Sequence, residues 1–336
     1  MIMTQIMNWE ERMEKFRWCF IGTGTLAKQI AQVILASGRH EIVSCYTRNP
    51  EKCEEFAKEY GCRAYPNAED AMLAEGVQGV YIVTPHNAHF RYAKQAIELG
   101  KPVLCEKAFT VNSYETDELI AISKAKGVYL CEAMWTWFGQ PANKVKEWVD
   151  SGKIGRVSDA RFTYCMKSIG YAPRVADPKR AGGALLDITI YPITYAYRLF
   201  GYPVSIKSNG HIQDGVDHWE EIQFEFKNGE KVSIRASIVD FKGLEKMEIR
   251  GEKGSIKAQF YHFGQKAVCS NGLFKKTVFK GEGNSIGYLP EFDTVASEIR
   301  EGLKESRMVP LKATSDVMHI IDDIKEQIGL VYDNLE

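Results

Sequence analysis

A glycine-rich turn near the start of the chain constrains its fold more than any other feature. Residues 22–27 are Gly-Thr-Gly-Thr-Leu-Ala, which is the pattern G-x-G-x-x-A. The turn follows a short apolar run, 17–21, and opens a segment with helical periodicity, 27–37. Gly22 permits a tight turn, Gly24 lets the backbone approach a diphosphate, and Ala27 keeps the helix close to the strand. The pattern predicts a dinucleotide-binding Rossmann unit, against the alternative of a glycine turn without a ligand.

The start of the predicted helix forms the second part of this site. A helix N-terminus leaves several backbone N–H groups unpaired, and these groups bind phosphate oxygens. We therefore expect the phosphates of a cofactor to lie against Gly22, Thr23, Gly24, Thr25 and Leu26.

Strand and helix signals alternate over the first 135 residues. Strand-like runs occupy residues 41–46, 77–83, 102–105 and 128–131, and helical patterns occupy 50–60, 88–99 and 113–126. The run 77–83 is largely apolar and β-branched, which is typical of a strand buried on both faces. Strands and helices alternating at this spacing predict parallel βαβ units, and hence an α/β Rossmann domain over residues 1–135.

The pattern changes after about residue 135. Helices are expected over 141–151, 183–199, 290–305 and 315–329, and strands over 157–164, 204–208, 219–226, 231–239, 246–251 and 255–260. Asn228-Gly229 lies between two of these strands and is a strong hairpin signal. We therefore predict a second domain, 136–336, of the α+β class with a largely antiparallel open sheet.

Composition and charge exclude several classes of protein. A formal net charge of -1 gives no electrostatic reason to bind nucleic acid or an anionic membrane. No run approaches the roughly 18 apolar residues of a membrane helix, and the charged segment 1–16 lacks the apolar core of an export signal. The eight cysteines include no Cys-x-x-Cys pair and no zinc-type Cys/His cluster. We expect a cytoplasmic, reduced protein without a structural metal.

The end of the second predicted strand bears on the choice of cofactor. NAD-binding domains usually carry an acid about 20 residues after the glycines, which accepts from the ribose 2′-hydroxyl. Residues 45–49 are Cys-Tyr-Thr-Arg-Asn, with no acid. The hydroxyl of Thr47 and the guanidinium of Arg48 suit a 2′-phosphate better than a diol. We predict NADP(H) as the preferred cofactor and NAD(H) as the second choice; the alternative is that Arg48 is a solvated loop residue.

Three residues are candidates for proton and oxyanion chemistry. Lys107 follows the strand 102–105, at the edge where ligands of doubly wound sheets bind. Asp187 and Tyr191 are four apart in a predicted helix, so both side chains lie on one face. Hydride transfer at a carbinol needs a proton acceptor and a positive neighbour for the oxygen. Lys107 would hold the oxygen, Tyr191 would transfer the proton with its pKa lowered by the lysine cation, and Asp187 would orient the substrate or the lysine. Taken singly, Tyr191 also fits a half-buried helix tyrosine, and Lys107 a surface lysine.

These candidates lie in motifs that resemble the Gfo/Idh/MocA oxidoreductases. That family carries Glu-Lys-Pro where this chain has Glu106-Lys107-Ala108, after the loop 84–89. Residues 132–136 and 182–192 are similar to the branch that contains dimeric dihydrodiol dehydrogenase and related sugar dehydrogenases. Most of the wider family has histidine at the place of Tyr191, whereas that branch has tyrosine. The resemblance covers nearly the whole chain.

The resemblance implies an NADP(H)-dependent dehydrogenase or reductase acting on a sugar, a polyol or a trans-dihydrodiol. It implies that Lys107, Asp187 and Tyr191 are catalytic and that Trp135 lines the substrate pocket with them. Further cofactor contacts are expected at Thr84, Pro85, His89, Glu106 and Lys107. It also implies a homo-oligomer, a dimer or tetramer, formed through the open sheet.

Other functions and other pocket residues remain open from the sequence. One alternative is a non-catalytic nucleotide-binding sensor or structural subunit, and another is a reductase acting on a different carbonyl or an imine. His86 lies on the same loop as His89. Weaker candidates for the same cleft precede the helix of Asp187: Arg161, Phe162, Tyr164, Tyr171 and Arg174.

Overall fold

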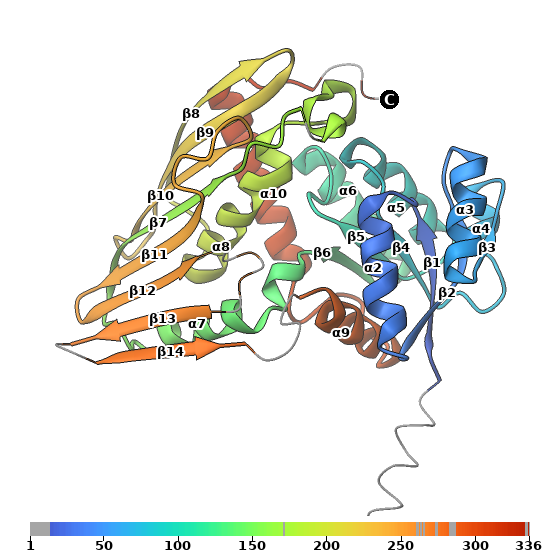
Figure 1. Ribbon diagram of the computed structural model, residues 1–336, viewed down its shortest axis with the longest axis horizontal. Helices are drawn as coiled ribbons and strands as arrows, with labels where there is room; N and C mark the ends of the chain where they lie inside the picture. The colour runs from blue at the N-terminus through green and yellow to red at the C-terminus, as the bar shows by residue number, and fades with distance from the viewer. Residues whose placement is uncertain are drawn as a thin grey trace, which may run out of the picture.

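Two sheets lie side by side, with the C-terminal helix α10 (Leu311–Ile328) between them (Figure 1). The computed structural model describes residues 14–170, 172–259, 262, 264, 266–272, 275–281, 287–332 and 335. Most of the segment 1–16, Tyr171 and the last residue of the strand predicted over 255–260 lie outside these residues.

The first half of the chain forms a parallel sheet of six strands. Their spatial order is β3-β2-β1-β4-β5-β6, which is the order of doubly wound dinucleotide-binding domains. The strands are β1 (Phe16–Ile21), β2 (His40–Tyr46), β3 (Arg63–Ala64), β4 (Gly79–Ile82), β5 (Val103–Glu106) and β6 (Leu130–Ala133). The α/β prediction is confirmed, although the two-residue β3 was not predicted.

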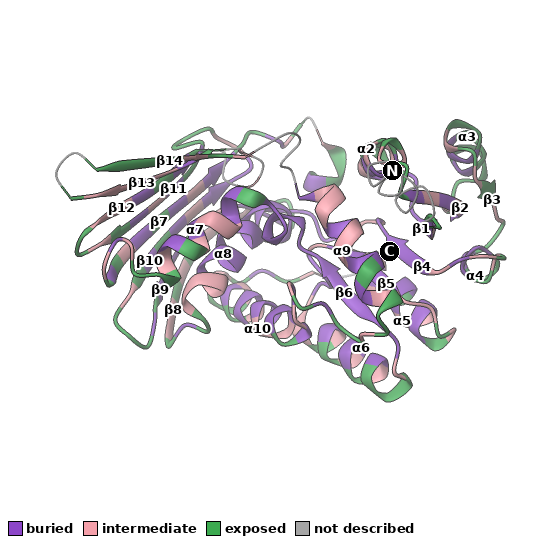
Figure 2. Ribbon diagram, turned by 90° about the horizontal axis from the view of Figure 1, so that it is seen from below, coloured by how far each residue is buried: buried purple, intermediate pink, exposed green. Residues whose placement is uncertain are grey.

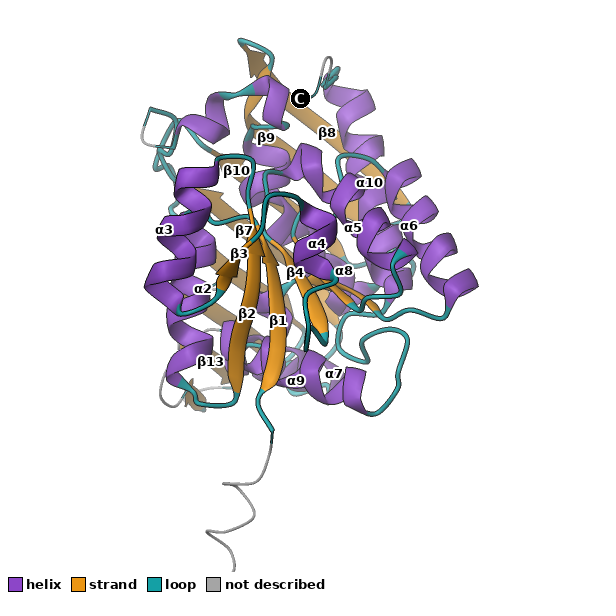
Figure 3. Ribbon diagram, turned by 90° about the vertical axis from the view of Figure 1, so that its right-hand side faces the viewer, coloured by secondary structure: helices purple, strands orange, loops and turns teal. Residues whose placement is uncertain are grey.

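Helices cover both faces of this sheet (Figure 3). They are α2 (Thr25–Ala36), α3 (Pro50–Tyr60), α4 (Ala68–Met72), α5 (His89–Glu98) and α6 (Ser113–Lys126). Strand β1 is apolar on both sides because both of its faces are buried. Phe16, Trp18 and Phe20 pack into the core on the side of α2 and α3, whereas Cys19 and Ile21 pack on the side of α4, α5 and α6. A strand buried on both faces cannot alternate apolar and polar residues.

The second half of the chain contributes a sheet of eight strands in the order β14-β13-β12-β11-β7-β10-β9-β8. The strands are β7 (Val157–Cys165), β8 (Ser205–Gln213), β9 (Val216–Glu225), β10 (Lys231–Ser237), β11 (Glu245–Gly251), β12 (Gly254–Gln259), β13 (Lys266–Asn271) and β14 (Lys276–Lys280). Strands β7 and β10 pair in parallel, and the other neighbours pair antiparallel. The prediction of a largely antiparallel sheet is confirmed.

The predicted hairpin at Asn228-Gly229 joins β9 to β10. Two backbone hydrogen bonds close the turn. Phe226 N donates to Glu230 O at 3.0 Å, and Gly229 N donates to Phe226 O at 2.9 Å. Gly229 has a φ of +92°, a conformation that glycine adopts without steric cost. Strand β8 is longer than the predicted run 204–208, and β13 and β14 were not predicted.

The eight-stranded sheet has one covered face and one open face (Figure 2). The covered face packs on α7 (Gln140–Asp150) and α8 (Ile190–Phe200), while α9 (Tyr288–Arg300) returns to α2 of the first sheet. The open face carries charged pairs such as Arg235 with Glu221, 2.7 Å apart, and Lys257 with Glu248, 3.1 Å apart. One buried core extends from the first sheet across α9 into the second, so the two halves are packed against each other.

The described ranges hold no helix that is long and apolar enough to cross a membrane. Within the same ranges, no group of three or more His, Cys, Asp or Glu side chains is arranged to hold a metal ion. All eight cysteines are free thiols.

Candidate active site

A cavity of about 300 Å³ lies at the carboxyl ends of β1, β4 and β5. Strands β1 and β4 are neighbours in space, and the strand order reverses between them, which is where ligands of doubly wound sheets bind. Three lining residues, Arg174, Arg180 and Asp187, come from the second half of the chain, so both halves form the cavity. Its lining residues are Gly24, Thr25, Leu26, Val83, Thr84, Pro85, His86, Glu106, Lys107, Arg174, Arg180 and Asp187.

One end of the cavity is formed by the glycine turn and the start of α2. Gly22 has a φ of +109°, and a Cβ there would lie 2.6 Å from the carbonyl oxygen of Val83, so only glycine fits. Gly24 is the N-cap of α2 without a side-chain cap, and the first turn holds no acid. The free N–H groups at this end fit a diphosphate. Thr23 is buried and, like Gly22, shapes the turn rather than lining the cavity.

Lys107 projects from the end of β5 into the other end of the cavity. Its Nζ donates to the backbone carbonyl of Asp187 at 2.6 Å and lies 3.9 Å from the carboxylate Oδ1 of the same residue. The ammonium also lies over the ring of Tyr191, 4.6 Å from the ring centroid. The Lys107–Ala108 peptide bond is cis. The three predicted catalytic residues are therefore brought together, with alanine in place of the family's proline.

Burial and charge act against each other at this cluster. The side chains of Lys107 and Asp187 are only 10% and 9% exposed. Burial lowers the pKa of Lys107 from its ordinary value, while the Asp187 carboxylate opposes the shift. Burial acts to raise the pKa of Asp187, but the cations of Lys107 and Arg174 outweigh it and lower that pKa. Asp187 is thus held as a carboxylate next to a lysine that releases its proton more readily than a lysine in water.

Asp187 lies in a π-helical turn, Leu185–Thr189, rather than in the α-helix that the sequence predicted. The preceding Gly183 has a φ of +112° and leaves room for the buried carboxylate of Asp217. That carboxylate accepts from the backbone N–H of Leu185 at 2.5 Å, at the start of the π-helical turn. Wide turns of this kind often occur at functional sites. Here the turn places the carbonyl of Asp187 against Lys107.

Arg174 completes the ion cluster. Its Nη2 donates to Oδ1 of Asp187 at 2.7 Å, a shorter contact than Lys107 makes with the same oxygen. The sequence ranked Arg174 as a weak candidate because a lone arginine in a loop gives no signal of its partner. Of the other weak candidates, Arg161 faces solvent from β7, and Phe162 is core packed near Tyr195.

Tyr191 is enclosed by aromatic side chains. Its hydroxyl accepts a hydrogen bond of 3.1 Å from Nε1 of Trp135, and neither of these two buried side chains is among the residues that line the cavity. The rings of Trp135, Tyr164 and His262 lie with their centroids 5.4–5.9 Å from that of Tyr191. Burial raises the pKa of Tyr191 well above its ordinary value. The expectation that Lys107 lowers this pKa is therefore wrong, because the ammonium lies over the ring face and not at the hydroxyl.

His262 is a site residue that the sequence did not reveal. Its Nδ1 lies 2.5 Å from the buried carboxylate of Glu245, and its Nε2 lies 3.0 Å from the hydroxyl of Tyr164. These residues come from β7, β11 and the turn after β12. No spacing in the sequence links three such distant positions.

The loop after β4 and the end of β5 line the cavity with Thr84, Pro85, His86 and Glu106. Glu106 is buried, which raises its pKa, and accepts a hydrogen bond of 2.6 Å from the hydroxyl of Tyr81. His89, for which a cofactor contact was predicted, does not line this cavity. Its two ring nitrogens each lie 2.9 Å from a backbone carbonyl, of Thr84 and Ala108, and its fully buried ring supports the cavity wall without lining it. His86 lines the cavity instead.

Thr47 and Arg48 lie at the end of β2, outside the cavity of Lys107. Arg48 is exposed, next to the N-cap Asn49 of α3. This is the edge of the sheet on which β1 ends in the glycine turn, since β1 and β2 pair in parallel. A cofactor lying along this edge would reach both Gly24 and Arg48.

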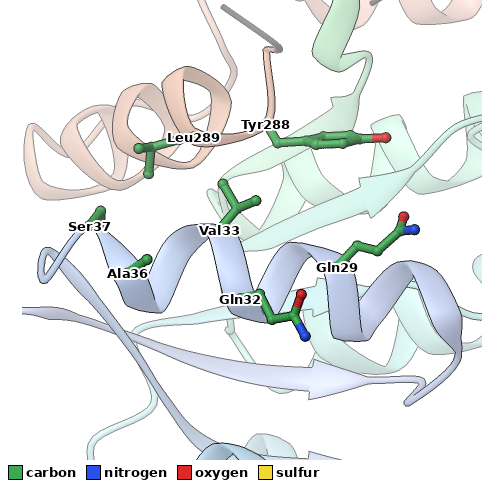
Figure 4. A pocket seen from close by; sticks show the side chains of 7 residues that line it. All are labelled: Gln29, Gln32, Val33, Ala36, Ser37, Tyr288 and Leu289. Carbon is green, nitrogen blue, oxygen red and sulfur yellow. The ribbon is translucent and has the colours of Figure 1, made fainter. Parts of the chain in front are cut away.

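A second cavity, of about 640 Å³, lies between α2 and the start of α9 (Figure 4). It is lined by Gln29, Gln32, Val33, Ala36, Ser37, Tyr288 and Leu289. None of the predicted cofactor or catalytic residues lines it. Tyr288 links it to the active site, because its ring packs against Trp135 with centroids 4.6 Å apart.

Comparisons with known proteins match both halves of the chain. Residues 16–133 match the model of an oxidoreductase family with an NAD-binding Rossmann fold, and residues 142–257 match the GFO/IDH/MocA C-terminal domain. Trans-1,2-dihydrobenzene-1,2-diol dehydrogenase of Mus musculus is 30% identical, with 94% of this chain and 98% of the relative covered. D-xylose 1-dehydrogenase (NADP(+)) of Hypocrea jecorina is 27% identical, with 95% and 93% covered.

A solved structure has the same fold at lower sequence identity. A 3-ketoreductase from Actinomadura kijaniata, in complex with NADP and TDP-benzene, superposes with a TM-score of 0.84 at 17% identity. The match covers 94% of this chain and 98% of that one, so both sheets are shared.

Proposed function

Because this chain belongs to the Gfo/Idh/MocA oxidoreductases, we propose that it transfers hydride between NADP(H) and a carbinol or carbonyl carbon of a sugar, a polyol or a trans-dihydrodiol. The observation that carries the proposal is the meeting of Lys107 and Asp187 at one end of the cavity whose other end is the glycine turn, with the ring of Tyr191 packed against the Lys107 ammonium. The bound nicotinamide supplies or accepts the hydride.

Lys107 and Tyr191 divide the proton chemistry between them. Lys107 binds the reacting oxygen and stabilises the charge that develops on it. Tyr191 donates a proton to that oxygen during carbonyl reduction, and it carries this proton at neutral pH because burial raises its pKa. Asp187 holds Lys107 through its carbonyl and keeps a negative charge beside it. A non-catalytic nucleotide sensor has no use for this arrangement.

The choice of substrate is tested by a screen of NADPH consumption. Aldoses, anhydrosugars, inosones and α-dicarbonyls are offered with NADPH, and polyols and trans-dihydrodiols are offered with NADP⁺. We expect saturable turnover with at least one of these compounds. If purified protein binds NADPH but turns over none of them, the proposed reaction is wrong.

The NADP preference is supported by the names of relatives and by Arg48 at the end of β2. We expect kcat/KM to be at least about tenfold higher with NADPH than with NADH. Arg48→Gln is expected to lower kcat/KM for NADPH by about tenfold or more, because a charge-assisted contact to the 2′-phosphate is lost, and to leave NADH within about twofold. Lys58→Gln, an exposed cation near the end of α3, serves as the control. A higher kcat/KM with NADH in the unaltered protein would contradict the role of Arg48.

The remaining proposals concern organisation and location. We propose a division into a Rossmann domain, 1–135, and a substrate-binding and oligomerisation domain, 136–336. We also propose a homo-oligomer through the open face of the eight-stranded sheet. The charged pairs on that face support contacts between opposite charges across a two-fold axis, and light scattering at low and high salt tests them. The eight free thiols support a cytoplasmic location, which cell fractionation tests.

A further inference from the structure

A loop from the second half of the chain crosses the cavity and is fastened to the first half. It contains two short 3-10 turns, Pro173–Ala176 and Pro178–Arg180. The carbonyl oxygen of Ala181 lies 3.1 Å from Nδ1 of the buried His86. The carbonyl oxygen of Lys179 accepts a hydrogen bond of 3.2 Å from the side chain of Asn87. These two contacts hold Arg180, which lies between the two carbonyls in sequence, over the loop that follows β4.

Arg180 lines the same cavity as Gly24 and Thr25. Its Nε lies 3.1 Å from Oδ2 of Asp177, and the other oxygen of that carboxylate accepts from the backbone N–H of Lys179. The carboxylate is thus fixed to its own turn and orients the guanidinium. The side chain is 42% exposed, so solvent and a ligand can reach it.

Arg180 differs from the other two cations of the cavity in its partner, because it pairs with Asp177 of its own turn. Lys107 and Arg174 both contact Asp187 at the catalytic end. At the glycine end, the first turn of α2 contributes N–H groups and no acid, and the nearby Lys28 is paired with Glu59 at 2.7 Å. A diphosphate placed there by the helix would carry about two negative charges. A planar guanidinium is suited to pair with phosphate oxygens in a low-water site.

We propose that Arg180 binds the diphosphate of NADP(H), so that the second half of the chain holds the cofactor bound on the first half. The proposal rests on the proposed function in assuming NADP(H) as the ligand. It adds a cofactor contact that neither the glycine motif nor the Arg48 position predicts. It also makes the loop that carries Arg180 part of the cofactor site, next to the Asp187 turn that forms the catalytic end.

The experiment is a fluorescence titration of the full-length protein with NADPH, without substrate. Arg180→Gln is expected to raise the Kd for NADPH by about tenfold, as for the loss of one charge-assisted contact. Arg180→Lys keeps the charge without the planar fork and should fall between the two. Competition by 2′-AMP, which has the 2′-phosphate but no diphosphate, should be unchanged in Arg180→Gln. Arg156→Gln is the matched control, since Arg156 is 73% exposed and pairs with Glu252 away from the cavity.

Three outcomes would overturn the proposed role of Arg180. An unchanged Kd for NADPH in Arg180→Gln overturns the proposal, while NADPH binding by the unaltered protein leaves the proposed function standing. An unchanged Kd together with a raised KM for the second substrate also overturns it, and assigns Arg180 to substrate. If Arg180→Gln weakens the binding of 2′-AMP as much as that of NADPH, the whole cofactor site is damaged, and the proposal is overturned as well. Thermal unfolding of Arg180→Gln is compared with that of Arg156→Gln, and Arg180→Lys supplies the test if the glutamine variant is unstable.

Discussion

Replacing Lys107 by methionine is expected to lower kcat by about 10³-fold or more while leaving the Kd for NADPH within about threefold. Methionine keeps much of the length and apolar stem of the side chain but removes the ammonium. That ammonium contacts the carbonyl of Asp187 and lies over the ring of Tyr191. Its loss removes the positive charge at the reacting oxygen, which contributes only when charge develops in the transition state. Single-turnover rates and NADPH titration separate the two effects.

Lys101→Met provides a control just before the amino end of β5. Lys101 precedes the amino end of β5, whereas Lys107 follows its carboxyl end. The Nζ of Lys101 donates to the carbonyl of Val77 at 3.3 Å. We expect this variant to keep its turnover. Near-normal turnover in Lys107→Met would remove Lys107 from the reaction and favour a purely structural role in holding the Asp187 turn. A loss of NADPH binding equal to the loss of turnover would assign Lys107 to the cofactor alone.

The first half of the fold was predictable because its signals are local. Central strands such as β4 and β5 are buried on both faces, and Gly22 marks the first strand–helix turn, so the βαβ order follows from short segments such as 77–83. The second sheet was predicted in class but not in detail. Its parallel pair, β7 with β10, joins segments more than 60 residues apart, and no local pattern records such a pairing.

In the candidate site, too, the residues in local motifs were predicted, whereas contacts between distant segments were not. Lys107, Asp187 and Tyr191 were predicted from motif spacing, and the structure places them in contact. Of their partners, Arg174 was only a weak pocket candidate, and His262 was not predicted. Arg174 and Arg180 approach through a loop whose path depends on the packing of the two halves. The first residue of the π-helical turn, Leu185, donates to a buried carboxylate, Asp217, that lies on another strand.

The pKa of Tyr191 illustrates why charge alone misled the sequence argument. From the sequence, the Lys107 cation was expected to stabilise the phenolate of Tyr191 and so to lower its pKa. In the structure, the burial of Tyr191 dominates and raises its pKa, and the cation lies on the ring face. Tyr191 is therefore a neutral phenol across the neutral range. Ionisation of Tyr191 should produce no loss of reductase activity at or below about pH 10.

Tyr191→Phe is expected to lower kcat for carbonyl reduction by about 10²-fold, with the Kd for NADPH unchanged. Phenylalanine keeps the ring that packs on Trp135 and under Lys107, so the change removes only the hydroxyl. Because this hydroxyl accepts from Nε1 of Trp135, its own hydrogen is left to point at a substrate oxygen. The loss should be smaller than for Lys107→Met, since water can replace a proton donor more readily than a fixed positive charge.

Tyr197→Phe is the matched control, since Tyr197 lies on the same helix and its hydroxyl donates to Asp316 at 2.6 Å, outside the cavity. A proton-donor role predicts that Tyr191→Phe has a solvent isotope effect on kcat different from that of the unaltered enzyme, whereas Tyr197→Phe does not. If Tyr191→Phe retains full turnover, the proton comes from another group, and Lys107 becomes the remaining donor. Burial lowers its pKa and its ammonium lies over the Tyr191 ring, so Lys107 is placed to supply the proton in that case.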